Sequence, residues 1–172
     1  MSRTLEVRRT VAADWQRFRD LRLEMLADAP LAFAESLESA ATEDESKWTK
    51  RAAHGSSENA IRLVAIAEGD RWVGTMGCVV PDDGGPGLLL IGVYVTPDYR
   101  GATFGVADAL LAGIEEWARS RAESIVLHVH ETNFRAQAAY ARRGFVFTGR
   151  KFPYELDESQ NELEMLKNLS DG

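Results

Sequence analysis

The strongest constraint on the fold is an apolar segment that runs into a glycine-bearing turn and then a helical pattern. The run Leu88–Val95 is typical of a buried strand, and Pro97 ends it because proline has no N–H to donate to a sheet. The turn has Arg100 and Gly101 at its tip, and the helical pattern opens at Gly105. The first turn of a helix has N–H groups without partners, and the helix dipole adds partial positive charge there. The turn is therefore a candidate site for a phosphate or pyrophosphate.

A second segment makes this interpretation more specific, since a glycine turn alone occurs in many proteins. It follows another short strand and reads Asn133-Phe134-Arg135-Ala136-Gln137-Ala138-Ala139-Tyr140-Ala141-Arg142-Arg143-Gly144-Phe145. Together the two segments resemble the GCN5-related N-acetyltransferases (GNAT), and with the order of elements the resemblance covers nearly the whole chain. In that family an Arg/Gln-x-x-Gly-x-Gly/Ala turn follows the fourth strand, and an Asn-x-x-Ala-x-x-x-Tyr-x-x-x-Gly-Phe segment follows the fifth. The second motif is matched at every named position. The first is matched at Arg100 and Gly105, with Thr103 at its middle glycine.

Size and charge exclude some classes of function. With 172 residues, of which 45% are hydrophobic and 27% charged, the chain is expected to form one globular domain over residues 1–172. The formal net charge of −7 argues against a nucleic-acid binder, which would carry a basic face. It mildly favours cationic partners such as amines.

The single cysteine, Cys78, lies among apolar residues and is interpreted as a buried thiol rather than a nucleophile. No disulfide can form within the chain, which is compatible with a reducing compartment. Residues 1–9 lack the apolar core of a signal peptide, and no apolar run approaches the ~20 residues of a membrane span. We expect a soluble cytoplasmic protein without membrane partners.

Periodicity predicts helices and strands that form one mixed sheet. Helical patterns begin at Asp14, Glu43, Gly105 and Asn133. Strands are expected at Leu5–Arg9, Ile61–Glu68, Arg71–Pro81, Leu88–Val95, Ser124–His130, Phe145–Gly149 and Glu162–Leu169, with a polar connection over Lys151–Asn161. The expected fold class is α/β (α+β) with helices on both faces of the sheet. The resemblance further implies a mostly antiparallel central sheet whose fourth and fifth strands splay apart.

The resemblance implies acetyl transfer from acetyl-coenzyme A to an amine. The pantetheine arm would lie between the splayed strands and pair with backbone groups of Val93 and Val95. Backbone amides of the turn, helped by Arg100, would wrap the pyrophosphate, and Asn133 would bond the pantetheine or cap its own helix. The expected cofactor-binding residues are Val93, Tyr94, Val95, Arg100, Gly101, Ala102, Thr103, Phe104, Gly105, Val106 and Asn133.

Thr103 stands at a position where the family motif has a glycine. A β-branched residue at positive φ is strained, whereas at negative φ a threonine costs little. Its hydroxyl could then cap the helix or bond a phosphate oxygen.

Removal of a proton from the amine requires a base, and His128 on the fifth strand is the candidate. The unperturbed imidazole suits this task near neutral pH. A partly buried histidine bonded to a neighbouring strand is an equally weighted alternative. His130 shares the face and is the weaker candidate. Zinc needs three or four protein ligands, so these two histidines do not predict a metal site.

Tyr140 matches the family's tyrosine, whose hydroxyl lies beside the cofactor sulfur, and is the expected general acid for the departing thiolate. Without the motif, a helix tyrosine packed on the sheet would be the default interpretation. The oxyanion would be stabilised by a backbone N–H of Tyr94 or Val95.

The acceptor is expected to be an amine of a small molecule or a peptide. Phe33 and Trp48 lie in the region that covers the acceptor site in the family and are candidates for its lining, with buried packing as the alternative. Members of the family often pair through C-terminal strands, so a homodimer is left open. Two other functions also remain open: a non-catalytic acyl-coenzyme A binder that regulates a partner, and a nucleotide-binding module.

Overall fold

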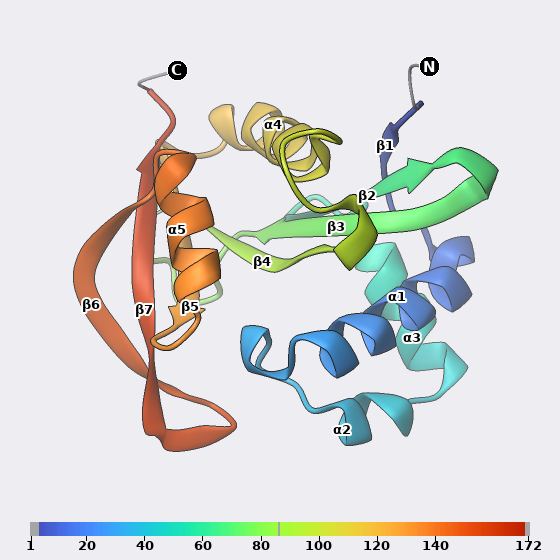
Figure 1. The fold of residues 1–172 in the computed structure, drawn as a ribbon, viewed down its shortest axis with the longest axis horizontal. Coiled ribbons are helices and arrows are strands. Elements are labelled where there is room, and N and C mark those ends of the chain that lie inside the picture. Colours follow the sequence, from blue (N-terminus) through green and yellow to red (C-terminus); the bar gives the residue numbers. More distant parts are fainter. Residues whose placement is uncertain (1–3, 86, 171–172) are drawn as a thin grey trace.

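The computed structural model describes residues 4–85 and 87–170, and its strands form one seven-stranded sheet (Figure 1). The strands are β1 (Glu6–Arg9), β2 (Ala60–Ala67), β3 (Arg71–Val79), β4 (Leu88–Val95), β5 (Ser124–His130), β6 (Val146–Tyr154) and β7 (Asp157–Asn168). Their spatial order is β1-β2-β3-β4-β5-β7-β6, and all neighbours are antiparallel except the parallel pair β4 and β5. The mixed, mostly antiparallel sheet expected from the sequence is confirmed.

Helices flank the sheet on both faces. They are α1 (Trp15–Asp28), α2 (Leu37–Ala41), α3 (Glu45–His54), α4 (Val106–Arg119) and α5 (Phe134–Arg142), with short 3-10 turns that include η2 (Pro30–Ala32) and η4 (Pro97–Tyr99). Figure 1 shows α4 on one side of β2 and β3, α1 to α3 on the other side, and α5 beside β5 and β7. The buried side chains accordingly form two clusters, one with α4 and the other with α1 and α3.

The helix α4 forms where the sequence predicts its apolar stripe. The buried residues of this stripe are Val106, Leu110, Ile114 and Trp117, which recur at intervals of three and four. Gly74 of β3 makes room for the first turn of the helix, because a Cβ at this position would lie 2.8 Å from Cγ1 of Val106 and 3.1 Å from the backbone oxygen of Tyr94. The start of α4 is therefore held directly against the sheet, next to β4.

The parallel strands β4 and β5 pair only at their beginnings. The register contains two positions, Leu88 opposite Ile125 and Leu89 opposite Val126. Further along, β4 carries a bulge at Gly92, which has a φ of +57°, and its register with β3 shifts there. The two strands therefore diverge toward their C-terminal ends, which confirms the predicted splay.

The C-terminal hairpin differs from the prediction. β6 extends to Tyr154 and β7 begins at Asp157, so the polar connection expected over Lys151–Asn161 is wrong. Most of β6 is exposed and it forms the edge of the sheet, so its side chains need not alternate between apolar and polar. Backbone pairing, such as Lys151 opposite Leu163, defines this strand, and hydrophobic periodicity does not reveal it.

Cys78 is a free, buried thiol on β3, as expected from its apolar neighbours. Burial raises the pKa of its thiol to about 12, so it is not activated as a nucleophile. Among the helices of residues 4–85 and 87–170, none combines the length and the apolar character needed to cross a membrane.

The contact between Gly74 and α4 generates a stability prediction. Gly74→Ala places a Cβ against the stiff side chain of Val106 and a backbone oxygen, so we expect the free energy of unfolding to fall by about 1–3 kcal/mol. Gly113→Ala is the matched control, because its Cβ would meet the movable end of Leu63, and alanine favours a helix. Urea denaturation of both variants tests this prediction, and an equal loss for the two would contradict it.

Candidate active site

A cavity of about 1020 Å³ lies where β4 and β5 diverge. Its walls come from the end of α1 and the loop after it, from β4 and β5, from the turn before α4, and from α5. Among the residues singled out in the sequence, it is lined by Phe33, Val93, Tyr94, Val95, Arg100, Gly101, Ala102, Gly105, His128, His130, Asn133 and Tyr140. The structure thus brings together, in one cavity, both segments on which the family resemblance rests.

The edge of β4 that faces β5 is left without a strand partner beyond Leu89. At the bulge, Gly92 and Val93 also have no paired residue in the register with β3. This stretch lines the cavity, and an extended ligand could add to its backbone as a strand would, apart from the carbonyl oxygens of Gly92 and Val95, which accept from Arg62 and Arg100.

The turn before α4 has the backbone of an anion cradle. Gly101 has a φ of +101° and Gly105 a φ of +63°, and no atom lies within 4 Å of a Cβ built on either residue. Gly105 is the N-cap of α4 and provides no side chain to bond the free N–H groups of the first turn. The turn therefore presents open space and unpaired donors together, as a phosphate requires.

The structure explains why threonine is tolerated at position 103. Among the described residues, Asp70 is the one non-glycine residue with positive φ, so Thr103 has an ordinary backbone conformation. Its β-branched side chain is not strained there. Three residues of the turn that we expected to bind cofactor, Thr103, Phe104 and Val106, do not line the cavity, so a role for them would have to come from their backbone.

Arg100, which is expected to help wrap the pyrophosphate, lines the cavity and bonds two groups outside the turn. Its Nη2 donates to Oδ2 of Asp28 at 2.6 Å, and its Nε donates to the carbonyl oxygen of Val95 at 2.8 Å. The hydroxyl of Tyr94 donates to the same carboxylate oxygen at 3.0 Å. The bonds from Arg100 and Tyr94 lower the pKa of Asp28. Asp28 therefore stays ionised and joins the end of α1 to the end of β4.

Tyr140 lines the cavity from α5 and packs edge-on against Phe145, with 5.7 Å between the ring centroids. Burial raises the pKa of its phenol to about 12. The hydroxyl is therefore fully protonated at neutral pH. Asn133 lies at the start of the same helix, where its Oδ1 accepts from the backbone N–H of Ala136 at 3.2 Å, so it caps the helix and also lines the cavity.

His128 lies between two carboxylates of β7. Its Nδ1 is 4.0 Å from Oε2 of Glu162, and its Nε2 is 3.5 Å from Oε2 of Glu164. The ring stacks on Phe152 with 4.7 Å between centroids, and 30% of the side chain is exposed. Burial raises the pKa of Glu162. His128 is thus accessible from the cavity and lies beside two carboxylates.

His130 is not available in the same way. It is buried, its Nε2 lies 2.5 Å from Oε1 of Gln160, and its Nδ1 accepts from the backbone N–H of Thr132 at 3.1 Å. Both ring nitrogens are therefore occupied. No group of three or more His, Cys, Asp or Glu side chains in the described part of the chain is arranged to hold a metal ion.

The two acceptor-lining candidates have different positions. Phe33 contributes to the cavity wall, whereas Trp48 is 1% exposed, packs edge-on against Phe18 and does not line the cavity. Trp48 belongs to the core between α1, α3 and the sheet, so its assignment to the acceptor lining is wrong. Its place on the apolar face of α3 explains this burial.

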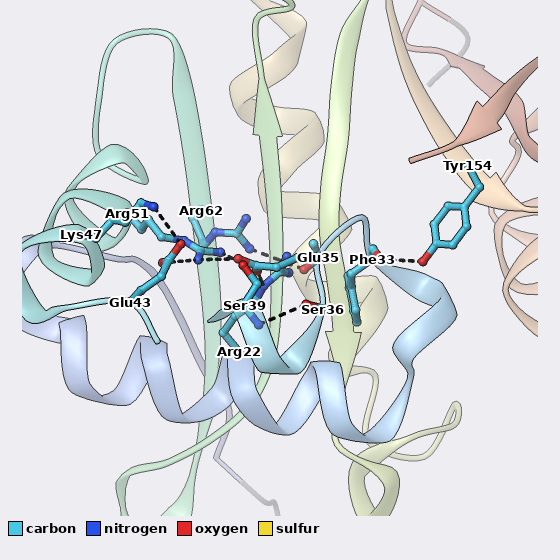
Figure 2. A network of polar contacts seen from close by, with 11 residues as sticks. Arg22, Phe33, Glu35, Ser36, Ser39, Glu43, Lys47, Arg51, Arg62 and Tyr154 are labelled. Atoms are coloured by element: carbon cyan, nitrogen blue, oxygen red, sulfur yellow. Dashed lines mark hydrogen bonds and ion pairs between the residues drawn. The ribbon is translucent and has the colours of Figure 1, made fainter. Parts of the chain in front are cut away.

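A network of polar contacts holds the loop that carries Phe33 (Figure 2). The hydroxyl of Tyr154 donates to the carbonyl oxygen of Phe33 at 2.9 Å and so joins the C-terminal hairpin to this loop. Glu35 pairs with Arg22 at 2.8 Å and with Arg51 at 3.0 Å. These bonds fix the loop from both of its sides.

Arg62 lies beside this network without a carboxylate partner among the described residues. Its Nη1 is 3.3 Å from Oγ1 of Thr75 and 3.5 Å from the carbonyl oxygen of Gly92. Burial, together with the charges of Arg22 and Arg51, lowers the pKa of Arg62 to about 9. The guanidinium thus lies behind the β4 bulge, where the glycine leaves space for it.

Several residues of the site were missed in the sequence. Asp28, Tyr154 and Glu162 occupy the cavity wall or its supports, yet each lies outside the two motifs. Glu162 could have been found from the alternation of the last strand. Asp28 and Tyr154 are defined by contacts between distant parts of the chain, and no local pattern indicates them.

The comparisons with known proteins agree with this geometry. The model of the acetyltransferase (GNAT) family matches residues 18–145. The chain belongs to this family. N-acetyltransferase is the enzyme class that this membership assigns to it. A search of curated proteins gives no significant match.

Three solved structures illustrate the likeness. Nourseothricin acetyltransferase is 26% identical over 65% of this chain and 66% of its own length, with a TM-score of 0.58. A GCN5-related N-acetyltransferase from Kribbella flavida is 22% identical over 95% of this chain and 97% of its own, with a TM-score of 0.72. PaiA N-acetyltransferase from Thermoplasma acidophilum, in complex with coenzyme A, is 16% identical over 96% and 99%, with a TM-score of 0.68. The last two similarities, at 22% and 16% identity, show that the chain shares the fold of these proteins.

The open cradle at Gly105 generates a prediction for cofactor binding. Gly105→Val would put a side chain into the space beside the first turn of α4, so we expect the affinity for acetyl-coenzyme A to fall by roughly tenfold or more. Gly69→Val is a matched control, because Gly69 also has positive φ and open space but lies in the β2–β3 turn. Calorimetric titration that finds equal affinities for the two folded variants would contradict the assignment.

Proposed function

We propose that the protein is an acetyl-coenzyme A-dependent N-acetyltransferase that transfers acetyl to a primary amine of a small molecule or a peptide by direct attack. The observation that carries this proposal is the cavity between β4 and β5. It joins an open anion cradle at the turn to His128 and Tyr140, which can each move a proton. When bound, the cofactor would supply the acetyl group as a thioester.

The residues present fit this cofactor. Glycines leave the turn open at Gly101 and Gly105, and the first turn of α4 has no side-chain cap. The turn would hold the pyrophosphate, and the free edge of β4 would pair with the amides of the pantetheine arm. The coenzyme A in the structural relative PaiA supports this choice of ligand.

The chain's own groups would then perform the proton transfers. His128 would accept a proton from the ammonium form of the acceptor, directly or through water, since only a neutral amine is nucleophilic. A backbone N–H of Tyr94 or Val95 would donate to the carbonyl oxygen that gains negative charge. Tyr140 would donate its proton to the sulfur that leaves, because its phenol remains protonated at neutral pH.

A non-catalytic acyl-coenzyme A binder is the alternative function. Two features favour it, the departure at Thr103 and the lack of an assigned base, whereas the presence of Tyr140 speaks against it. The ordinary backbone conformation of Thr103 removes the first of these reasons. Thiol release from acetyl-coenzyme A, measured over a panel of amines with the mass of each product, distinguishes the two functions. If the rate of thiol release with protein equals the rate without protein for every amine in the panel, the result would support the non-catalytic binder.

Tyr140→Phe keeps the ring and its packing on Phe145 but removes the proton. We expect the single-turnover rate to fall by ~10²–10⁴-fold, with little change in affinity for acetyl-coenzyme A or in thermal stability. Single-turnover kinetics excludes product release as the limiting step. A variant with the parent's single-turnover rate would show that Tyr140 is a packing residue.

His128→Ala tests the base. We expect turnover near neutral pH to fall by ~10²-fold or more, while cofactor affinity stays close to that of the parent. His54→Ala is the control, because His54 is exposed at the end of α3. Equal turnover of the His128 variant and the parent from acid to alkaline pH would assign the base role to water or to another group.

A further inference from the structure

The helix α5 presents two arginines to the cavity from one of its faces. Arg135 and Arg142 are seven residues apart, which is close to two turns, and both line the cavity. Both side chains belong to exposed residues. With Ala139 between them, the two guanidinium groups form a cationic strip, defined here as Arg135 and Arg142, separated by roughly 10 Å along the helix axis.

The other arginines at this end of the cavity already have partners. Arg100 is bonded to Asp28. Arg143 pairs with Asp108 of α4 at 2.8 Å and donates to the carbonyl oxygen of Ala139 at 2.9 Å. Within residues 4–85 and 87–170, Arg142 makes no hydrogen bond or ion pair. The one interaction of Arg135 in this part of the chain is electrostatic, because its positive charge helps to lower the pKa of Asp28.

Arg142, at the C-terminal end of the cationic strip, lies on the side of the open turn, whereas the charge of Arg135 acts on Asp28 at the end of α1. The cavity lining includes Gly101, Ala102 and Gly105 from the turn, and Arg142 from α5. The ion pair between Arg143 and Asp108 joins the C-terminal end of α5 to the first turns of α4, so Arg142 lies near the uncapped start of α4. Backbone donors of the turn and two uncommitted guanidinium groups therefore line the same cavity.

We propose that Arg135 and Arg142 bind the phosphate groups of the cofactor and replace Arg100 as its main source of positive charge. This inference rests on the proposed function. Coenzyme A carries a pyrophosphate and a 3′-phosphate, and a guanidinium binds phosphate oxygens through a planar pair of donors. Because the whole chain carries a formal charge of −7, a polyanion needs such a local cationic surface to enter.

Calorimetric titration of Arg135→Gln, Arg142→Gln and the double variant tests the cationic strip. The ligands are coenzyme A and 3′-dephospho-coenzyme A, each at low and high salt. We expect each single variant to lose about tenfold in affinity for coenzyme A at low salt, and the double variant to lose more and to show a weaker dependence on salt. A loss for coenzyme A alone assigns an arginine to the 3′-phosphate, and a loss for both ligands assigns it to the pyrophosphate.

Arg119→Gln is the matched control, since it makes the same charge change on α4 at a residue that pairs with Glu115 and does not line the cavity. Thermal unfolding of all variants checks that the fold is kept. Unchanged affinities in the α5 variants, or an equal loss in Arg119→Gln, would overturn the inference while leaving the proposed function intact. A parent protein that binds no coenzyme A would overturn the proposed function itself.

Discussion

The molecule depends on two parallel strands that are paired at one end and separated at the other. β4 and β5 share only two register positions, so the facing edges beyond them have backbone groups without a strand partner. Unpaired edges inside a protein are costly unless water or a ligand satisfies them. Beside the opening, Tyr140 and Ala136 of α5 pack against the core, while α4 packs on β2 and β3. The cavity thus lies where the register of β4 and β5 ends.

Charge divides this cavity into two parts. Arg142 of α5 lies on the side of the turn before α4, whereas Glu155 and Glu162 line the part near His128. Arg100 also lines the cavity, and it bonds Asp28 at the end of α1 and the backbone of Val95 at the end of β4. An arginine in such a position stabilises the shape of the site through fixed bonds, and its charge is largely neutralised by Asp28. The motif position alone does not reveal this.

The sequence predicted what is encoded locally. The strand Leu88–Val95, the stripe of α4 and the helix after Asn133 each have a period or a cap that sequence shows directly. It failed where a partner distant in the chain decides the structure. β6 is defined by its pairing with β7, and the ion pair of Arg100 depends on a carboxylate 72 positions away. Periodicity contains no information on such partners.

The bond between Tyr154 and the loop at Phe33 has a consequence for how this fold can diversify. Two segments 121 residues apart meet there, and neither of them contributes to the turn before α4. The wall near Phe33 can therefore change by substitution or by altered hairpin length, while the turn and the strip on α5 keep their geometry. In such a fold, the ligand bound near Phe33 can change while the ligand bound at the turn stays the same. The end of the β6–β7 hairpin is therefore a suitable position for engineering selectivity.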